Sequence, residues 1–410
     1  MSTTLGTTPL ALSSVTEALK EHYKPLRVKN MVYKNNPLLA MMPKYESFGG
    51  ENMPVPIVYA NNARRSAAFA KAQGNDSTSK VGQFLLTRVK DYAFATVNGE
   101  AIKATQSNTD AFLRLLTLEV DGALNALTRS LAVAMYRDGG GSVGQVGSVS
   151  TDVVTLSNSE DVTNFEVGME VRFGTTKTGS VRVGVTGITA VDRSAGTITV
   201  TASDITGGPT ANDYIFQEGD EQDGATNPLR ISGLEAWCPE TAPGATTFFG
   251  QDRSVDTTRL GGNRFDGSAL PIEEALIEGA SLVAREGGSP DYVFVDFATY
   301  TKLEKALSSK IQYTTATARD VDIGFSGIKI NGPRGMMTVL PDQNCQPDVA
   351  WMVQMDTWCL NSLGAAPHFL DYDGTRMLRE IDADAYETRL GFYGNIGCNA
   401  PGWNCRIKLA

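Results

Sequence analysis

The sequence predicts an α+β protein built from several domains. Two runs with alternating apolar residues, 53–60 and 89–99, are typical of strands, and apolar residues at helical spacing run through 109–137. Short strand-like runs fill 142–217, and helix and strand patterns alternate over 271–370. The chain has 410 residues. Since a single core rarely grows beyond about 250–300 residues, we expect two or three domains, or one domain with insertions.

Residues 1–50 are predicted to form an arm. The stretch SSVTEALKEHY can form one short helix with a capping box at its start, and Pro25 ends it. NNPLLAMMP, residues 35–43, is a small apolar patch with helix breakers at both ends. We expect so thin a segment to have no core of its own.

Residues 51–98 are predicted to form a long two-stranded hairpin. Its strands would be Met53–Ala60 and Val89–Gly99, with the polar, small-residue segment Ala63–Lys80 as a loose tip. The two prolines of the first strand cannot donate to a ladder and fit only an edge. Such a hairpin is at best marginally stable alone in water, so we expect its tip to pack against another molecule.

Residues 99–141 are predicted to carry a long spine helix. Apolar residues recur every three or four positions from Phe112 to Ala134, which places them on one helix face, and DGGG at 138–141 stops the pattern. An ordinary core helix is the alternative, because it would show the same stripe.

The rest of the chain divides into four stretches. Residues 142–217 are predicted to be an all-β insertion, because glycine is frequent and helix signals vanish; a small barrel and a sandwich both fit. Residues 218–270 are loop-rich, 271–370 are predicted to be a compact α+β domain, and 371–410 are predicted to be two long strands joined by a turn.

Charge and composition narrow the function classes. The net charge is −10, whereas specific nucleic-acid binders usually show a basic footprint. An acidic protein can still enclose DNA without gripping it. No signal peptide and no apolar run of membrane-spanning length is visible, so we expect no membrane contact and action in the compartment where the protein is made.

Few residues suggest catalytic or metal chemistry. The five cysteines are widely spaced and are expected to be free thiols, with a disulfide between Cys398 and Cys405 or a metal site as alternatives. The acidic run at 219–224 is interpreted as a solvated loop, with a hard-cation site as the alternative. His22 and His368 have no nucleophile beside them in the sequence. We therefore expect no enzyme activity, no cofactor and no metal, and an assembly protein instead.

Several motifs follow one another in an order that covers nearly the whole chain. They are VYKNNPLLAMMPK, NMPVPIVYANNARRSAAFAKAQ, DYAFATVNGE leading into a long helix, GMEVRF…GTITV…DYIFQEGD, GLEAW, RLGGNR, LPIEEAL and AYETRLGFYGN. In this order they resemble the major capsid protein of tailed double-stranded DNA bacteriophages, whose fold is shared with herpesvirus capsid proteins and encapsulin shells. The resemblance implies an N-terminal arm (1–50), an extended loop (51–98), a peripheral domain (99–141, 218–270 and 371–410), a variable insertion (142–217) and an axial domain (271–370).

The resemblance also implies which residues meet other copies of the chain. The extended loop would lie across a neighbouring subunit, and the arm would wrap adjacent subunits. The implied contacts in the loop are Arg64, Arg65, Phe69, Lys71 and Lys80, and those in the arm are Tyr33, Leu38 and Leu39.

The implied function is structural. The chain would form hexamers and pentamers of an icosahedral phage head around double-stranded DNA, assembled in the host bacterial cytoplasm. The portal and scaffolding or decoration proteins would be further partners. Alternatives are the shell protein of a bacterial nanocompartment of the encapsulin kind, a tail or fibre protein, and a soluble α+β enzyme.

Overall fold

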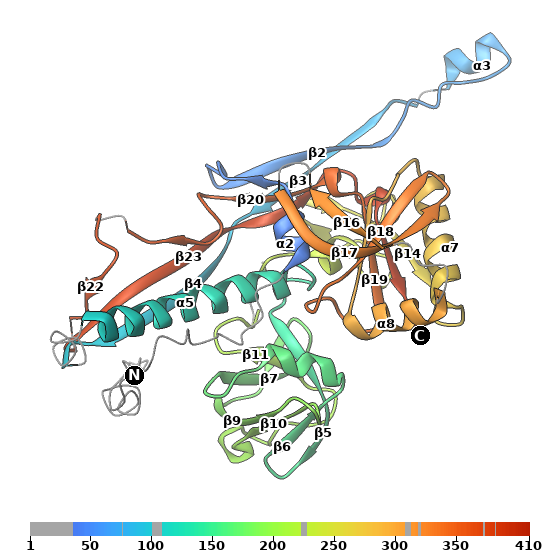
Figure 1. Cartoon of the computed structure of the whole chain (residues 1–410). Coiled ribbons are helices and arrows are strands. Elements are labelled where there is room, and N and C mark those ends of the chain that lie inside the picture. Colours follow the sequence, from blue (N-terminus) through green and yellow to red (C-terminus); the bar gives the residue numbers. More distant parts are fainter. Residues whose placement is uncertain are drawn as a thin grey trace. The chain divides into compact units, whose positions relative to one another are not determined.

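The computed structural model combines helices and strands, which confirms the predicted α+β class (Figure 1). The chain divides into two compact units, the first made of 1–35, 90–130 and 364–393 and the second of the remaining residues. The described residues are 36–75, 77–100, 109–222, 228–307, 313–318, 321–371, 374–381 and 383–410, with side chains described in all of these except 109–118, 313–318 and 321–326.

The first unit holds most of the predicted spine helix. This helix, α5, runs from Thr109 to Ala134 and its last turn belongs to the second unit. Leu127, on the predicted apolar stripe, is buried. The polar hydroxyl of Ser130, off that stripe, donates to Asp91 Oδ2 at 2.8 Å and so links α5 to the strand β4.

The strands of the first unit pair around β23. β4 (Val89–Asn98) pairs with β23 (Ala385–Cys398), and the short strands β21 (His368–Phe369) and β22 (Leu378–Arg379) pair antiparallel with it. The rings of Tyr92 and Tyr393 meet edge to face with their centroids 5.8 Å apart. Such aromatic pairs add to the packing of neighbouring strands.

The hairpin in the second unit corrects the predicted partner of its first strand. β2 (Asn52–Ala60) pairs antiparallel with β3 (Lys80–Thr87), and β4 pairs with β23 instead. The sequence prediction was wrong because β3 begins within the segment interpreted as a loose tip. In β3, Phe84 and Leu86 alternate with polar or half-buried positions and are both fully buried. β2 has β3 as its one partner among the described strands, which accommodates its two prolines.

The predicted α+β block forms a seven-stranded mixed sheet in the second unit. Its strand order is β14-β24-β19-β15-β18-β17-β16. Helices α7 (Ile272–Arg285) and α8 (Phe297–Leu307) pack on it, and their apolar faces share one core with the strands. The strand bounds are β14 Asn263–Asp266, β15 Tyr292–Val295, β16 Tyr313–Ala318, β17 Val321–Gly332, β18 Gly335–Pro341, β19 Val349–Val353 and β24 Cys405–Lys408.

The two predicted C-terminal strands lie in different sheets. β24 lies between β14 and β19 in the seven-stranded sheet, whereas the end of β23 pairs with β20 (Trp358–Ser362) in another sheet. The chain passes from one sheet to the other through the short helix η5 (Pro401–Trp403). Residues 218–270 and 394–410 both fall in the second unit.

The predicted all-β insertion is a closed barrel. The hydrogen-bonded strand order is β11-β5-β6-β10-β9-β7-β8, and a further pairing of β11 with β7 closes the ring. Closure leaves no edge among the six ring strands, which removes a site of unwanted strand pairing. The strand bounds are β5 Ser142–Ser150, β6 Val153–Leu156, β7 Glu170–Thr176, β8 Gly179–Val181, β9 Thr186–Asp192, β10 Thr197–Val200 and β11 Tyr214–Gln217.

Side chains that alternate inward fill the barrel. Ile198, Ile215 and Phe173 are each fully buried in one apolar cluster. Two short helices, η1 (Ser159–Asn164) and η2 (Ala202–Asp204), connect strands. Arg137, just after α5, forms an ion pair of 2.8 Å with Asp161 of η1 and so ties the barrel to the chain that enters it.

The start of the described chain is a packed segment of the second unit. α2 (Pro37–Met41) is followed by β1 (Lys44–Tyr45), which pairs with β20. The buried carboxylate of Asp342 accepts hydrogen bonds from the Tyr136 hydroxyl at 2.8 Å and from the Leu38 amide at 3.5 Å. This shared acceptor joins α2, the end of α5 and the seven-stranded sheet.

The five cysteines are free thiols. Cys238, Cys345, Cys398 and Cys405 are buried, and Cys359 is half-buried. Burial raises the pKa of Cys238 to about 12 and also raises the pKa of Cys359. The reactive species of a cysteine is its thiolate, so burial suppresses reaction twice, by blocking access and by disfavouring the ionised form.

We predict that an aromatic disulfide reagent labels the native protein slowly and at Cys359 alone. The other four thiols should react only after denaturation. Cys359→Ser should abolish the native reaction and leave four reactive thiols in denaturant. Rapid labelling of two or more thiols in the native protein would contradict the observed burial.

We predict that Phe84→Ala destabilises the second unit by about 3–5 kcal/mol, the usual cost of emptying a buried phenylalanine site. Phe84 is 0% exposed, and its ring lies 4.9 Å from that of Trp237. Urea unfolding measures the change. Val81→Ala on the same strand is the matched control, because Val81 is 66% exposed and its truncation should have little effect.

We predict that Tyr136→Phe lowers the free energy of unfolding by about 1–3 kcal/mol, because a buried carboxylate loses a donor. Burial raises the pKa of Asp342, so this group's contribution to stability falls as pH rises through its folded pKa. The Tyr136 hydroxyl stabilises the ionised carboxylate, so the loss should be larger at a pH above the folded pKa of Asp342 than at a pH below it. Urea unfolding at both pH values tests this. Tyr292→Phe is the control. If Tyr136→Phe lowers the free energy of unfolding equally at both pH values, the prediction is wrong.

Candidate inter-subunit contact surface

The tip of the hairpin is an exposed loop that carries a short helix. Nearly all described residues from Asn61 to Lys80 are exposed, and α3 (Phe69–Gly74) has no buried residue. The five residues expected to contact a neighbour, Arg64, Arg65, Phe69, Lys71 and Lys80, are all exposed. The structure therefore brings the predicted loop contacts together at one tip.

Hydrogen bonds across the tip hold its two sides together. Arg64 Nε donates to the carbonyl of Asn75 at 2.8 Å, and Asn75 Nδ2 donates to the carbonyl of Ala63 at 3.2 Å. The Asn62 amide donates to Ser79 Oγ at 3.1 Å. Arg64 thus has a role inside its own loop that the sequence did not indicate.

Apolar side chains are exposed on the same hairpin. Phe69 is 83% exposed, and the cross-strand partners Val58 and Val81 are 61% and 66% exposed. Burying a phenylalanine or valine side chain is worth about 1.5–3 kcal/mol. Exposed apolar groups of this kind, beside cations, are typical of a surface that binds a protein.

Three cations of the tip have no ion partner among the described residues. Arg65, Lys71 and Lys80 form no salt bridge there. Ion pairs of exposed groups contribute only about 0–1 kcal/mol each, and they set orientation and partner choice more than affinity. The apolar groups must then supply most of any binding energy at this surface.

The opposite end of the hairpin is anchored in the second unit by aromatic packing. Phe84 meets Trp237 and Phe248 edge to face, with ring centroids 4.9 and 6.2 Å away. The Leu85 amide donates to the carbonyl of Phe249 at 2.9 Å, and Trp237 Nε1 donates to the carbonyl of Ile396 at 3.2 Å. The hairpin therefore has a rigid base and a tip without packing of its own.

Trp237 occupies its central place because of the glycine that precedes its helix. α6 (Leu234–Trp237) begins after Gly233, where a Cβ atom would lie 2.2 Å from the carbonyl oxygen of Met135. No other residue allows so close an approach. The neighbouring two-residue strands are β12 (Thr247–Phe248) and β13 (Gln251–Asp252).

Arg253 adds a cation to this aromatic base. Its guanidinium lies 4.1 Å from the centroid of Phe248, and Nη1 donates to the carbonyl of Ala236 at 2.8 Å. Burial lowers the pKa of Arg253 to about 10. The aromatic base was not predicted from the sequence, because its stretch of the chain was interpreted as loops. The apolar clusters GLEAW and TTFFG in that stretch are the signal that indicates it.

The predicted arm contacts are corrected in part. Leu38 and Leu39 are only 1% and 7% exposed because α2 is packed into its own chain, so neither presents a surface to a neighbour. Tyr33 lies outside the described residues. The described part of the predicted arm, 36–50, packs against residues such as Asp342, which lies some three hundred positions further along the chain.

The described part of the acidic run, residues 219–222, is only partly solvated. Glu221 is 8% exposed and forms an ion pair with Arg172, and Asp220 lies 3.4 Å from Arg230. Among the described residues, no group of three or more histidine, cysteine, aspartate or glutamate side chains could hold a metal ion. No helix in the described ranges is long and apolar enough to cross a membrane.

Comparisons with known proteins place this geometry in context. A family model described as SU10 major capsid protein matches residues 211–375. The search of curated proteins finds no match. The matched residues include the end of the barrel and most of the seven-stranded sheet.

A solved structure with a similar fold comes from a cyanophage capsid. The chain in the capsid asymmetric unit of cyanophage A-1(L) is 11% identical, with 93% of this chain and 96% of that chain covered and a TM-score of 0.52. The capsid of a native GTA particle matches at 8% identity, 98% and 99% coverage and a TM-score of 0.49, and Mycobacterium phage Bobi at 11%, 98% and 98%, and 0.45. At these identities the likeness concerns the fold alone. The family match and the fold match together confirm the resemblance to the major capsid proteins of tailed phages and support a structural role in a capsid.

Proposed function

We propose that the chain assembles with copies of itself into hexamers and pentamers of an icosahedral phage head that encloses double-stranded DNA. The observation that carries the proposal is the hairpin, which combines a base anchored at Phe84 with a tip exposing Phe69 at 83%. A tip that is held by a few exposed hydrogen bonds and buries none of its helix α3 against its own chain gains packing only when a partner covers it.

Copies of the chain are a fitting partner for the tip. The protein carries 46 acidic against 36 basic side chains, so a second copy offers many carboxylates to Arg65, Lys71 and Lys80. Closed symmetric assemblies repeat one contact many times, so a contact of modest strength suffices to hold a shell. Assembly would take place in the host bacterial cytoplasm, with the portal and scaffolding or decoration proteins as further partners.

The packaged nucleic acid would be held without sequence recognition. The net charge of −10 disfavours tight wrapping of phosphate by the shell. The alternative of a nanocompartment shell makes the opposite prediction about content, since it would enclose protein. Absorbance and mass analysis of purified particles distinguishes the two by the presence of DNA or of protein cargo.

We predict that Phe69→Ala raises the subunit concentration needed for particle formation at least tenfold, because about 1.4 kcal/mol of lost burial corresponds to a factor of ten. Light scattering and electron microscopy over a concentration series measure the effect. Val255→Ala is the control, because Val255 is 63% exposed and lies outside the tip. The two variants assembling alike would count against the tip as a contact.

We also predict that deleting Asn61–Lys80 leaves a soluble, folded subunit that closes no shells. The base of the hairpin keeps its aromatic packing in this variant, so circular dichroism and thermal unfolding should resemble those of the full chain. Normal heads in electron micrographs of the deletion variant would refute the proposed role of the tip.

A further inference from the structure

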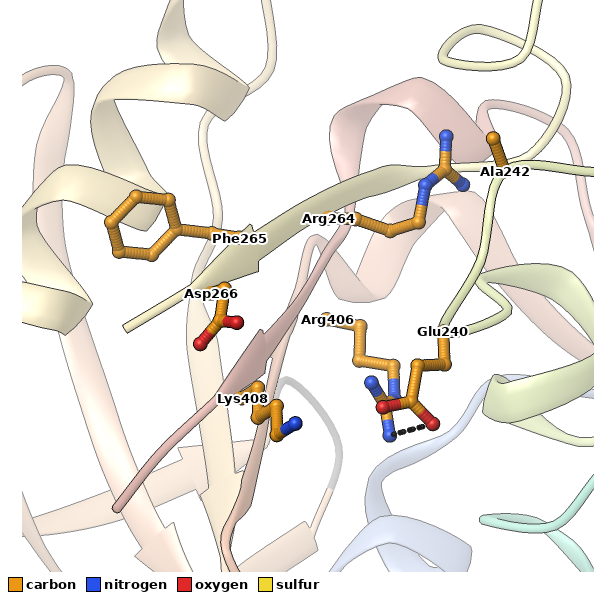
Figure 2. A pocket seen from close by; sticks show the side chains of 7 residues that line it. All are labelled: Glu240, Ala242, Arg264, Phe265, Asp266, Arg406 and Lys408. Atoms are coloured by element: carbon orange, nitrogen blue, oxygen red, sulfur yellow. Dashed lines mark ion pairs between the residues drawn. The ribbon is translucent and has the colours of Figure 1, made fainter. Parts of the chain in front are cut away.

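A pocket of ≈ 320 Å³ in the second unit concentrates basic side chains in an acidic protein (Figure 2). It lies along the adjacent parallel strands β14 and β24 and the chain that follows α6. Its lining residues are Glu240, Ala242, Arg264, Phe265, Asp266, Arg406 and Lys408. Nothing in the proposed hairpin contact uses this pocket.

The register of the two strands sets one pair of like charges beside one pair of opposite charges. Arg264 is the cross-strand partner of Arg406, and Asp266 is that of Lys408. Like charges at neighbouring positions of a sheet are destabilising unless an anion lies between or beside them. The strand pairing therefore creates an excess of positive charge at one place.

The groups around Arg264 do not neutralise it. Its guanidinium donates to the carbonyls of Gly261 and Thr257 at 2.9 and 2.8 Å, and it forms no ion pair among the described residues. Partial burial lowers the pKa of Arg264, which reflects the cost of holding its charge away from water. A bound anion would offset that cost.

The two carboxylates of the pocket do not form ion pairs with all of its basic side chains. Glu240 lies 3.5 Å from Arg406 Nη2 with its side chain 55% exposed, and Figure 2 shows these two groups pointing toward one another. Asp266 Oδ1 already accepts hydrogen bonds from the amide and hydroxyl of Ser268 at 3.1 and 2.6 Å. Arg406 Nε is buried and finds no acceptor in the described part of the chain, and Lys408 forms no salt bridge there.

We propose that this pocket binds an anionic oxygen group, supplied in the assembled protein by a carboxylate of a second copy of the chain. Guanidinium groups bind carboxylates and phosphates through paired, charge-assisted hydrogen bonds. A second copy is the natural source because the chain has ten more acidic than basic side chains, 46 against 36. The carboxylate source rests on the proposed shell assembly, whereas the anion site itself does not.

Inorganic phosphate is the probe for the site in the full-length, unassembled subunit. A phosphorus NMR titration at constant ionic strength should show saturable binding that Lys408→Gln weakens at least fivefold and Lys408→Arg largely restores. Lys329→Gln is the matched control, because Lys329 is an exposed lysine on β17 of the same sheet. Thermal unfolding of each variant checks that the fold is kept. Binding that does not saturate, or that Lys408→Gln and Lys329→Gln leave equally strong, overturns the anion site.

Assembly in phosphate against chloride at equal ionic strength tests the source of the anion. Phosphate should compete with the neighbouring carboxylate and raise the subunit concentration needed for assembly at least threefold. In chloride, Lys408→Gln should already raise the subunit concentration needed for assembly. Phosphate should have no further effect on this variant. If phosphate binds the subunit but neither phosphate nor Lys408→Gln changes assembly, the pocket takes a free anion and the carboxylate source is wrong. A chain that forms no particles at all contradicts the proposed shell, while the titration still decides the pocket.

Discussion

The contact between Phe84 and Trp237 is the constraint on which the hairpin depends. It buries one strand of the hairpin against an aromatic group, and Gly233 makes room for the helix that presents Trp237. Because the base is fixed in this way, the exposed tip is presented on a rigid support rather than on a free loop. The conformational entropy that the hairpin would otherwise lose on binding is thereby reduced.

Local patterns in the sequence predicted many of the elements but not their partners, and they missed the strand β3. The helix α5, the strands of the barrel and the α+β sheet were predicted from spacing, composition and turn residues, which act over a few positions. The pairing of β2 with β3 and of β4 with β23 was not, because alternation states which residues share a face and not which strand lies beside them. For the same reason, the sequence did not indicate that β23 and β24 lie in different sheets.

Exposure of the candidate contact residues was predicted correctly where it depends on neighbours in the sequence. It was predicted wrongly where it depends on residues far away in the sequence. Phe69, Arg65 and Lys71 are exposed as expected, since their neighbours in sequence are small and polar. Leu38 is buried, and its amide donates to Asp342, a partner some three hundred positions away that no pattern near Leu38 indicates. The pocket at Arg264 and Arg406 likewise arises from two strands far apart in the sequence.

Hydrogen exchange of the amides in the hairpin, compared between isolated subunits and purified particles, shows whether another copy covers the tip. We expect amides of 61–79 to exchange rapidly in the subunit and to become protected in the particle, while those near Phe84 are protected in both states because the base is packed in the single chain. If the tip amides exchange equally fast in subunit and particle, the tip contacts no other copy and is not an assembly surface.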